Sequence, residues 1–199
     1  MLKNKLKSIY TITFIAFVLL CAASIYTGRL PAVVAAFKEN IEAEKASKQL
    51  LEPYNVMDNT FHFELPDKWD TNEVSFAGGE ILYHMNFTSQ DKRIHGFVQV
   101  WKLSKPLKQF IDASKESAVG VVDFKYFDVK EIMINNKKGY LIDYSRANSQ
   151  GDYNRAYEVF VEGCTDKVYR MSFFVPEKEW RNYYKVHFDK IIHTMNIKK

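Results

Sequence analysis

After residue 60 the chain shows one segment in which apolar and polar residues alternate and several short apolar runs between polar loops, and this pattern predicts a domain built mainly from strands. The alternation is clear at residues 61–65, which read FHFEL, because successive side chains of a strand point to opposite faces. Aromatic and β-branched residues mark further segments as strands. We expect strands at residues 61–65, 81–87, 94–103, 124–134, 140–145, 156–162 and 168–175.

Two segments instead show apolar residues at helical spacing. The first lies between residues 107 and 118, follows Ser104 and Pro106, and is closed by Gly120, an order typical of the start and end of a helix. The second begins after Pro176 and continues to Met195. Short polar loops with Asn and Gly connect several strands, as in hairpins. The predicted fold class is therefore α+β, an antiparallel β-sheet with helices packed on its faces.

The N-terminal residues show a different pattern. Residues 9–26 are apolar and uncharged, and Lys3, Lys5 and Lys7 precede them. Because a helix needs roughly 20 apolar residues to span a bilayer, this run predicts an N-terminal transmembrane helix or membrane anchor within residues 1–30. The preceding lysines favour a cytoplasmic N-terminus. The alternative is a cleaved signal peptide, and both interpretations place the remaining chain outside the cytoplasm.

The residues after the anchor predict two further parts. Residues 31–53 are rich in good helix formers and have a thin apolar stripe, which predicts a helical stalk that ends at Pro53. Residues 54–199 contain no Gly/Ser-rich linker and no internal repeat. We therefore expect them to form one extracytoplasmic domain, held at the cell membrane by a single span.

Charge and cysteine content narrow the function classes. Residues 1–37 contain four basic residues and no acidic one, which accounts for the whole formal charge of +4. The predicted domain is formally neutral, so its charge gives no support for nucleic-acid binding, which needs a basic surface, and we expect no nucleic-acid partner. Cys21 and Cys164 are the two cysteines, and their placement in anchor and domain predicts no disulfide between them. We expect no cofactor.

The start and the end of the domain resemble those of a known family. Residues 61–69, FHFELPDKW, are similar to the aromatic-x-aromatic-x-x-Pro-x-x-Trp opening of PsbP-like domains. Residues 188–195, FDKIIHTM, are similar to the family's final helix. The resemblance covers residues 54–199 and implies an αβα sandwich, here in a membrane-anchored bacterial member. It also implies a binding or assembly role and supplies no catalytic residue; the photosystem role of the plant members is not carried over.

Candidate site residues are few. His84 and His95 lie on consecutive predicted strands and are the candidate metal ligands, although the chain has no HxH or HExxH motif. They support an alternative function, an extracytoplasmic metal-assisted hydrolase. The favoured hypothesis is a non-catalytic, membrane-tethered binding or assembly module for a protein or envelope component. Its candidate interaction surface is aromatic, since Tyr and Trp are enriched at interfaces, and comprises Tyr153, Tyr157, Trp180 and Tyr183.

Overall fold

The computed structural model describes residues 30–118, 120–163 and 166–198. The anchor predicted within residues 1–30 therefore lies almost wholly outside the described residues, as does Cys164. Among the described residues, no helix combines the length and the apolar character needed to cross a membrane. The chain divides into two compact units, residues 1–48 and residues 49–199.

The first unit is described by one helix, α2 (Leu30–Lys48). Most of its side chains are exposed, and Lys48 forms an ion pair with Glu44 one turn earlier, at 2.5 Å. The predicted stalk is thus helical, but it ends at Lys48 rather than at Pro53. Pro53 lies in strand β1 (Leu51–Val56). Because β1 is at the edge of its sheet, the missing N–H of proline is tolerated there.

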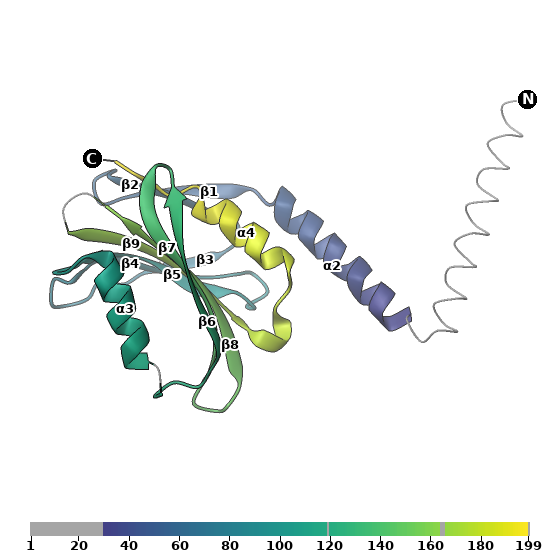
Figure 1. Ribbon diagram of the computed structural model, residues 1–199. Coiled ribbons are helices and arrows are strands. Elements are labelled where there is room, and N and C mark those ends of the chain that lie inside the picture. The colour runs from purple at the N-terminus through teal and green to yellow at the C-terminus, as the bar shows by residue number, and fades with distance from the viewer. Residues whose placement is uncertain (1–29, 119, 164–165, 199) are drawn as a thin grey trace, which may run out of the picture. The chain divides into compact units, whose positions relative to one another are not determined.

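The second unit contains two antiparallel sheets (Figure 1). The larger has seven strands in the order β3-β4-β5-β9-β8-β7-β6. The strands are β3 (Asp70–Glu73), β4 (Ile81–Thr88), β5 (His95–Lys102), β6 (Phe124–Ile134), β7 (Lys137–Ala147), β8 (Tyr153–Glu162) and β9 (Lys167–Pro176). Consecutive strands form hairpins except where α3 (Leu107–Ala118) connects β5 to β6.

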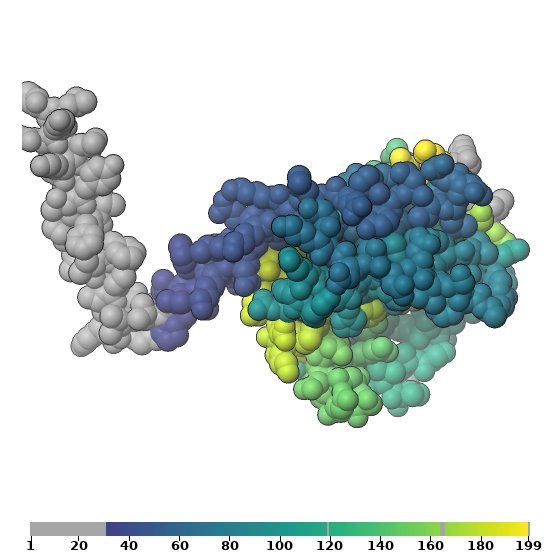
Figure 2. All heavy atoms as spheres, turned by 180° about the vertical axis from the view of Figure 1, so that it is seen from behind, coloured from purple at the N-terminus to yellow at the C-terminus, as the bar shows by residue number. Residues whose placement is uncertain are grey.

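The smaller sheet connects the beginning of the domain to its end. Its order is β1-β2-β10, with β2 (Phe61–Pro66) in the middle and β10 (Asn196–Ile197) on one side. The Thr194 hydroxyl, which precedes β10, accepts a hydrogen bond from the backbone N–H of Glu64 in β2 at 2.8 Å. Seen from behind, the early strands, in blue and teal, form a continuous surface of the domain (Figure 2).

One face of the larger sheet is covered by the smaller sheet and by α4 (Tyr183–Ile192). Their contact is the main core, in which Phe61, Phe63, Phe173 and Phe188 are fully buried. Phe173 and Phe188 stack with ring centroids 4.2 Å apart. The helices thus lie on both faces of an antiparallel sheet, which confirms the predicted fold class.

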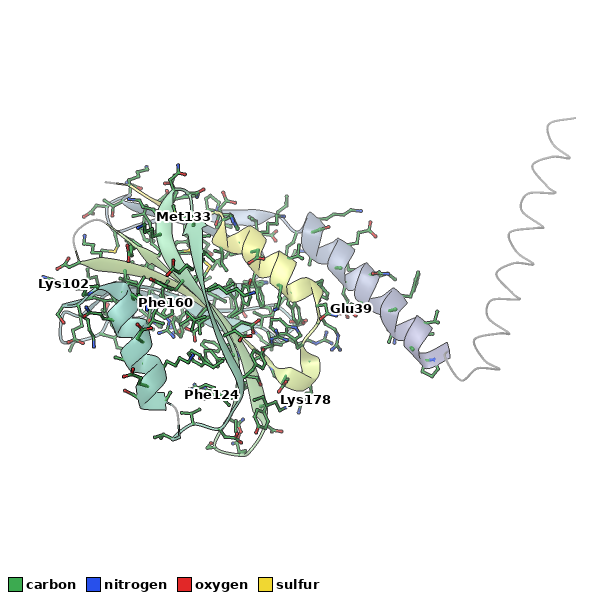
Figure 3. All side chains as sticks on the ribbon, in the orientation of Figure 1. Glu39, Lys102, Phe124, Met133, Phe160 and Lys178 are labelled. Atoms are coloured by element: carbon green, nitrogen blue, oxygen red, sulfur yellow. The ribbon has the colours of Figure 1, made fainter. Side chains whose placement is uncertain are left out.

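The opposite face of the larger sheet is partly covered by α3. Leu107 and Ile111 of this helix pack against Ile142, Tyr144 and the rings around Phe160. Figure 3 labels Phe160 and Phe124 on this side of the sheet. This half-covered face carries the site described below, and we call it the α3 face.

Three of the strands and the start of the last helix differ from the prediction. The strands β1, β3 and β10 were not expected, and β3 consists of exposed polar residues that carry no apolar signal. The last helix was expected to start directly after Pro176. Instead a short 3₁₀ helix (Glu177–Glu179) follows Pro176. The extended backbone of Trp180 separates this 3₁₀ helix from α4.

Candidate functional site

An open groove of about 770 Å³ lies on the α3 face. It crosses the sheet from the end of β4 to the hairpin between β7 and β8. Its walls and floor comprise Asn86, Phe87, Thr88, His95, Gly96, Phe97, Tyr144, Arg146, Ala147, Asn148, Ser149, Asn154 and Phe174. The volume falls in the range of small-molecule sites.

The groove exists because α3 is too short to cover the whole face. A helix of 12 residues is about 18 Å long. It packs on the part of the face around Ile142, Phe160 and Val168. The ends of β4, β5 and β9 extend beyond it, and their side chains His95, Phe97 and Phe174 form the aromatic floor of the groove. The rings of Phe97 and Phe174 are 5.7 Å apart.

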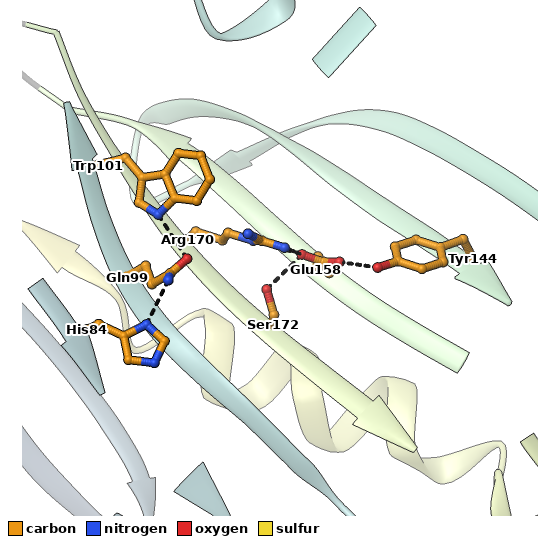
Figure 4. Close-up of polar contacts among 7 residues, drawn as sticks. All are labelled: His84, Gln99, Trp101, Tyr144, Glu158, Arg170 and Ser172. Carbon is orange, nitrogen blue, oxygen red and sulfur yellow. Dashed lines mark hydrogen bonds and ion pairs between the residues drawn. The ribbon is translucent and has the colours of Figure 1, made fainter. Parts of the chain in front are cut away.

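A buried ion pair lies beside the groove. Glu158 of β8 is 2% exposed and pairs with Arg170 of β9. Its carboxylate also accepts hydrogen bonds from the hydroxyls of Ser172 at 2.7 Å and Tyr144 at 2.6 Å (Figure 4). Burial and the Glu158 charge raise the pKa of the Tyr144 phenol. Since both carboxylate oxygens accept hydrogen bonds, Glu158 is held as a structural anion.

The Arg170 side chain is enclosed by rings. Its guanidinium carbon lies 4.7 Å from the ring centroid of Phe97 and 4.9 Å from that of Phe160. A guanidinium is attracted to ring faces and is weakly hydrated, so it suits this enclosed position. Arg170 thereby fixes Phe97 in the floor of the groove.

A chain of hydrogen bonds begins at Trp101 of β5 and leads towards the groove; Figure 4 shows its first three members, Trp101, Gln99 and His84. The Trp101 indole donates to the side-chain oxygen of Gln99 at 2.8 Å. The amide nitrogen of Gln99 is 2.7 Å from Nδ1 of His84, and Nε2 of His84 is 2.9 Å from the side-chain oxygen of Asn86.

The direction of this chain follows from its first member, because an indole N–H can only donate. The Gln99 amide therefore donates to Nδ1 of His84, and the proton of His84 is on Nε2. His84 in turn donates to the oxygen of Asn86. Asn86 lines the groove, so its amide NH₂ is the part of its side chain that is available to a ligand.

The predicted metal pair is not brought together. His84 is opposite Gln99 in the β4–β5 ladder, and His95 is opposite Thr88. Both histidines lie on the same face, but four residues of strand, about 13 Å, separate their ladder positions. No group of three or more His, Cys, Asp or Glu side chains in the described ranges could hold a metal. The expectation that His84 and His95 share one metal was therefore wrong, because it assumed a register four residues away from the real one.

The predicted aromatic surface is split between core and exterior. Tyr157 is 4% exposed, and its hydroxyl donates to Asp189 of α4 at 2.8 Å. Trp180 packs on Phe188 and receives the Arg155 guanidinium 3.9 Å above its ring. Tyr153 is nearer the solvent and donates to Asp123, and Tyr183 packs against Tyr184. Tyr157 is buried and Trp180 packs against the core, so the four side chains do not form one exposed surface.

A second polar cluster lies under α4 on the other face. Asp143 of β7 accepts hydrogen bonds from Arg155 at 3.0 Å and from Tyr126 at 2.8 Å, and it pairs with Lys185 at 2.7 Å. Burial by itself raises the pKa of Asp143, but these donors outweigh burial and the net pKa is lowered. The cluster joins α4 to the sheet.

Sequence reasoning missed the groove and its lining. The signal that could have revealed it is the period-two set His84, Asn86 and Thr88 on β4 with its partners on β5. This set mixes rings and amides on the face that a half-buried strand normally exposes to water. Arg146 comes from a distant hairpin, and nothing in the sequence around it indicates that its side chain lines the groove.

Comparison with known proteins assigns this architecture to a family. The fold defines an α+β sandwich, and the PsbP family model matches residues 49–197. The chain belongs to the PsbP family. The recognition made from the opening and closing motifs is confirmed, and the match begins five residues before the predicted domain boundary.

Solved structures show the same fold at low sequence identity. The solution structure of cyanobacterial PsbP (CyanoP) from Synechocystis sp. PCC 6803 is 14% identical with a TM-score of 0.54, and the match covers 74% of this chain and 92% of that one. A crystal structure from Bacteroides thetaiotaomicron is 14% identical with a TM-score of 0.51 over 74% of this chain and 48% of that one. No curated protein matches the sequence.

Proposed function

We propose that this PsbP-family chain is a membrane-tethered, extracytoplasmic binding module that holds a partner, either a protein or an envelope component, in the groove on its α3 face. The single observation that carries the proposal is the groove itself. It has the volume of a binding site, an aromatic floor, and polar groups at its margins.

The chemistry of the neighbouring side chains favours binding. Glu158 and Arg170 neutralise each other, and both oxygens of the Glu158 carboxylate accept hydrogen bonds. His84 is held between Gln99 and Asn86. Groups held in this way form a rigid support for a ligand, which lowers the entropy lost on binding.

The tether rests on the sequence of the first 30 residues. The apolar run at residues 9–26 has the length of a membrane span, and basic residues precede it. Because the net charge of the chain resides in residues 1–37, the formally neutral domain has no excess charge to hold it on an acidic lipid surface. The span would supply membrane attachment instead.

A crosslinking experiment on the full chain in bacterial membranes tests the binding role. A photoreactive phenylalanine analogue replaces His95, which is exposed within the groove, and in a matched variant replaces Val121, which is 83% exposed and is not among the residues that line the groove. We expect a discrete crosslinked species from position 95 and none from position 121. Equal crosslinking at both positions, or none at position 95, would contradict the proposal.

The tether is tested separately in spheroplasts. We expect the full chain to remain in the membrane pellet after a carbonate wash and to leave it only with detergent. Protease added from outside should remove the domain while a cytoplasmic marker stays intact. Recovery of the intact, full-length chain in the soluble cytosolic fraction would contradict this part of the proposal.

A further inference from the structure

The charges around the groove are unbalanced, and this imbalance indicates what the groove binds. No residue that lines it is acidic, and its one formally charged member is Arg146. In the described part of the chain, the structure shows no carboxylate paired with Arg146, and its guanidinium carbon lies 6.0 Å from the ring centroid of Tyr144. In the formally neutral domain, this cation faces the groove without a matching anion.

The aromatic floor lies beside that charge. The ladders place Tyr144 opposite Ala156, and Ala156 opposite Phe174. Tyr144 and Phe174 are therefore two strand spacings apart, about 10 Å. Phe97, whose ring contacts that of Phe174, continues the apolar floor on the next strand. A ligand whose polar end is bound at Arg146 could thus lay its apolar part along the rings of Phe174 and Phe97.

The opposite end of the groove presents a neutral donor. Asn86 has its side-chain oxygen engaged by His84, so its NH₂ group is the part available to a ligand. Strands β4 and β7 are four spacings apart, about 19 Å. Hydrogen-bond donors therefore lie at both ends of an apolar floor, with the cation at one end alone.

We propose that the groove binds a small amphipathic organic anion, with its carboxylate on Arg146 and its apolar body over Phe174 and Phe97. This inference rests on the proposed binding function and gives it a ligand class. A guanidinium forms paired hydrogen bonds with a carboxylate, and the rings bury the apolar body. The Arg146 guanidinium would repel the charged group of a cationic ligand.

The test uses 2-naphthoate and its neutral isostere 2-naphthamide as probes, measured by calorimetric titration of the detergent-solubilised full chain. We expect 2-naphthoate to bind at least about tenfold more tightly than 2-naphthamide, a ratio that corresponds to one well-placed ion pair. Arg146→Gln should remove this preference and leave the affinity for 2-naphthamide nearly unchanged.

Two further variants separate charge from packing. Asn154 is the cross-strand partner of Arg146, so Asn154→Asp should pair with the cation and weaken 2-naphthoate binding alone. Phe174→Leu should weaken both probes. Lys130→Gln, an exposed cation that is not among the residues lining the groove, is the matched control and should change neither affinity. Circular dichroism of each variant verifies that the domain is folded.

The outcomes separate the ligand class from the binding function. Equal affinity for the two probes, a preference that survives Arg146→Gln, or no binding at millimolar probe would overturn the amphipathic-anion proposal. Crosslinking from position 95 would in that case still support a binding module with a different ligand. If position 95 gave no crosslink but naphthoate binding still depended on charge, the proposal of a macromolecular partner would be overturned and the amphipathic-anion proposal would stand.

Discussion

The backbone of Gly96 lies so close to the carbonyl oxygen of Ser172 that a Cβ on the glycine would be 1.9 Å from that oxygen. The same Cβ would be 2.6 Å from the ring of Phe87. Gly96 is in the ladder between β5 and β9 and lines the groove. The contact allows two central strands and a buried ring to pack without a gap.

Gly96→Ala should therefore destabilise the domain by more than about 2 kcal/mol, because the added methyl group must push apart either two strands or the Phe87 ring. Urea unfolding measures the change. Gly120→Ala is the control: no atom lies within 4 Å of its added Cβ, but its φ is +81°, so a smaller cost of about 1 kcal/mol is expected. A Gly96→Ala variant as stable as the native chain would show that the strands separate without cost.

Glu158→Gln should cost about 3–5 kcal/mol, because it leaves the enclosed Arg170 guanidinium without its counter-ion. The matched control is Asp70→Asn, which removes an ion pair with Lys92. Those side chains are 73% and 63% exposed, so the expected change is below about 1 kcal/mol. Chemical denaturation of both variants provides the comparison. Similar small losses in the two variants would mean that Glu158 is not an energetically important buried charge.

Gln99→Leu should be more destabilising than Trp101→Phe. The first change leaves two polar atoms without their partner: Nδ1 of the buried His84, at about 1–3 kcal/mol, and the indole nitrogen of the half-buried Trp101, at less. The second leaves only the Gln99 oxygen unpaired and keeps a ring against Phe110. Thermal unfolding followed by circular dichroism ranks the two variants. The reverse order would show that the chain does not stabilise the domain through Gln99.

The stability of the domain should fall as the pH drops from about 6.5 to 4, because of His187. This side chain is 7% exposed, and among the residues that the structure describes its Nδ1 atom has no hydrogen-bond partner. Burial, with a smaller effect of Lys190, lowers the pKa of His187 to about 4. Above pH 6.5 both the folded and the unfolded states are neutral at this position. Below it the unfolded state binds a proton first, so the free energy of unfolding decreases by up to about 1.4 kcal/mol per pH unit.

Urea unfolding at pH 7, 6 and 5 measures this slope. His187→Phe keeps a ring between Trp69 and Phe188 and should flatten the slope. His193→Gln, which changes a solvent-exposed histidine, should leave the slope as it is in the native chain. An unchanged slope in His187→Phe would assign the pH dependence to other groups.

The sequence was informative wherever side-chain pattern alone determines structure. The alternation at residues 61–65 predicted β2, in which every second one of these side chains is buried. Aromatic and β-branched residues predicted β9, and the spacing in α3 predicted a helix. The strand β3 could not be predicted, because its residues are exposed and polar and its pairing with β4 comes from tertiary contact. Pro53 suggested a break, but an edge strand accepts it.

The groove could not be predicted because it depends on registers and on segments that are far apart in sequence. Placing His84 opposite His95 requires only that the two strands form a hairpin. Placing His84 opposite Gln99 requires the geometry of the six-residue connection at residues 89–94. Arg146 reaches the groove through the order of the strands across the sheet. The pattern of residues in a strand indicates which side chains share a face of the sheet, but it does not establish which strands are neighbours.

The position of β10 determines when the domain can finish folding. The central strand of the smaller sheet, β2, has its outer partner at residues 196–197, and Thr194 bonds to Glu64 across 130 positions of sequence. A ribosome that has made most of this polypeptide has therefore not yet delivered the last strand. A nascent chain that has not reached residues 196–197 leaves one side of β2 without its partner strand, and such an incompletely paired chain could be threaded through a secretion channel before it folds, as the proposed export would require.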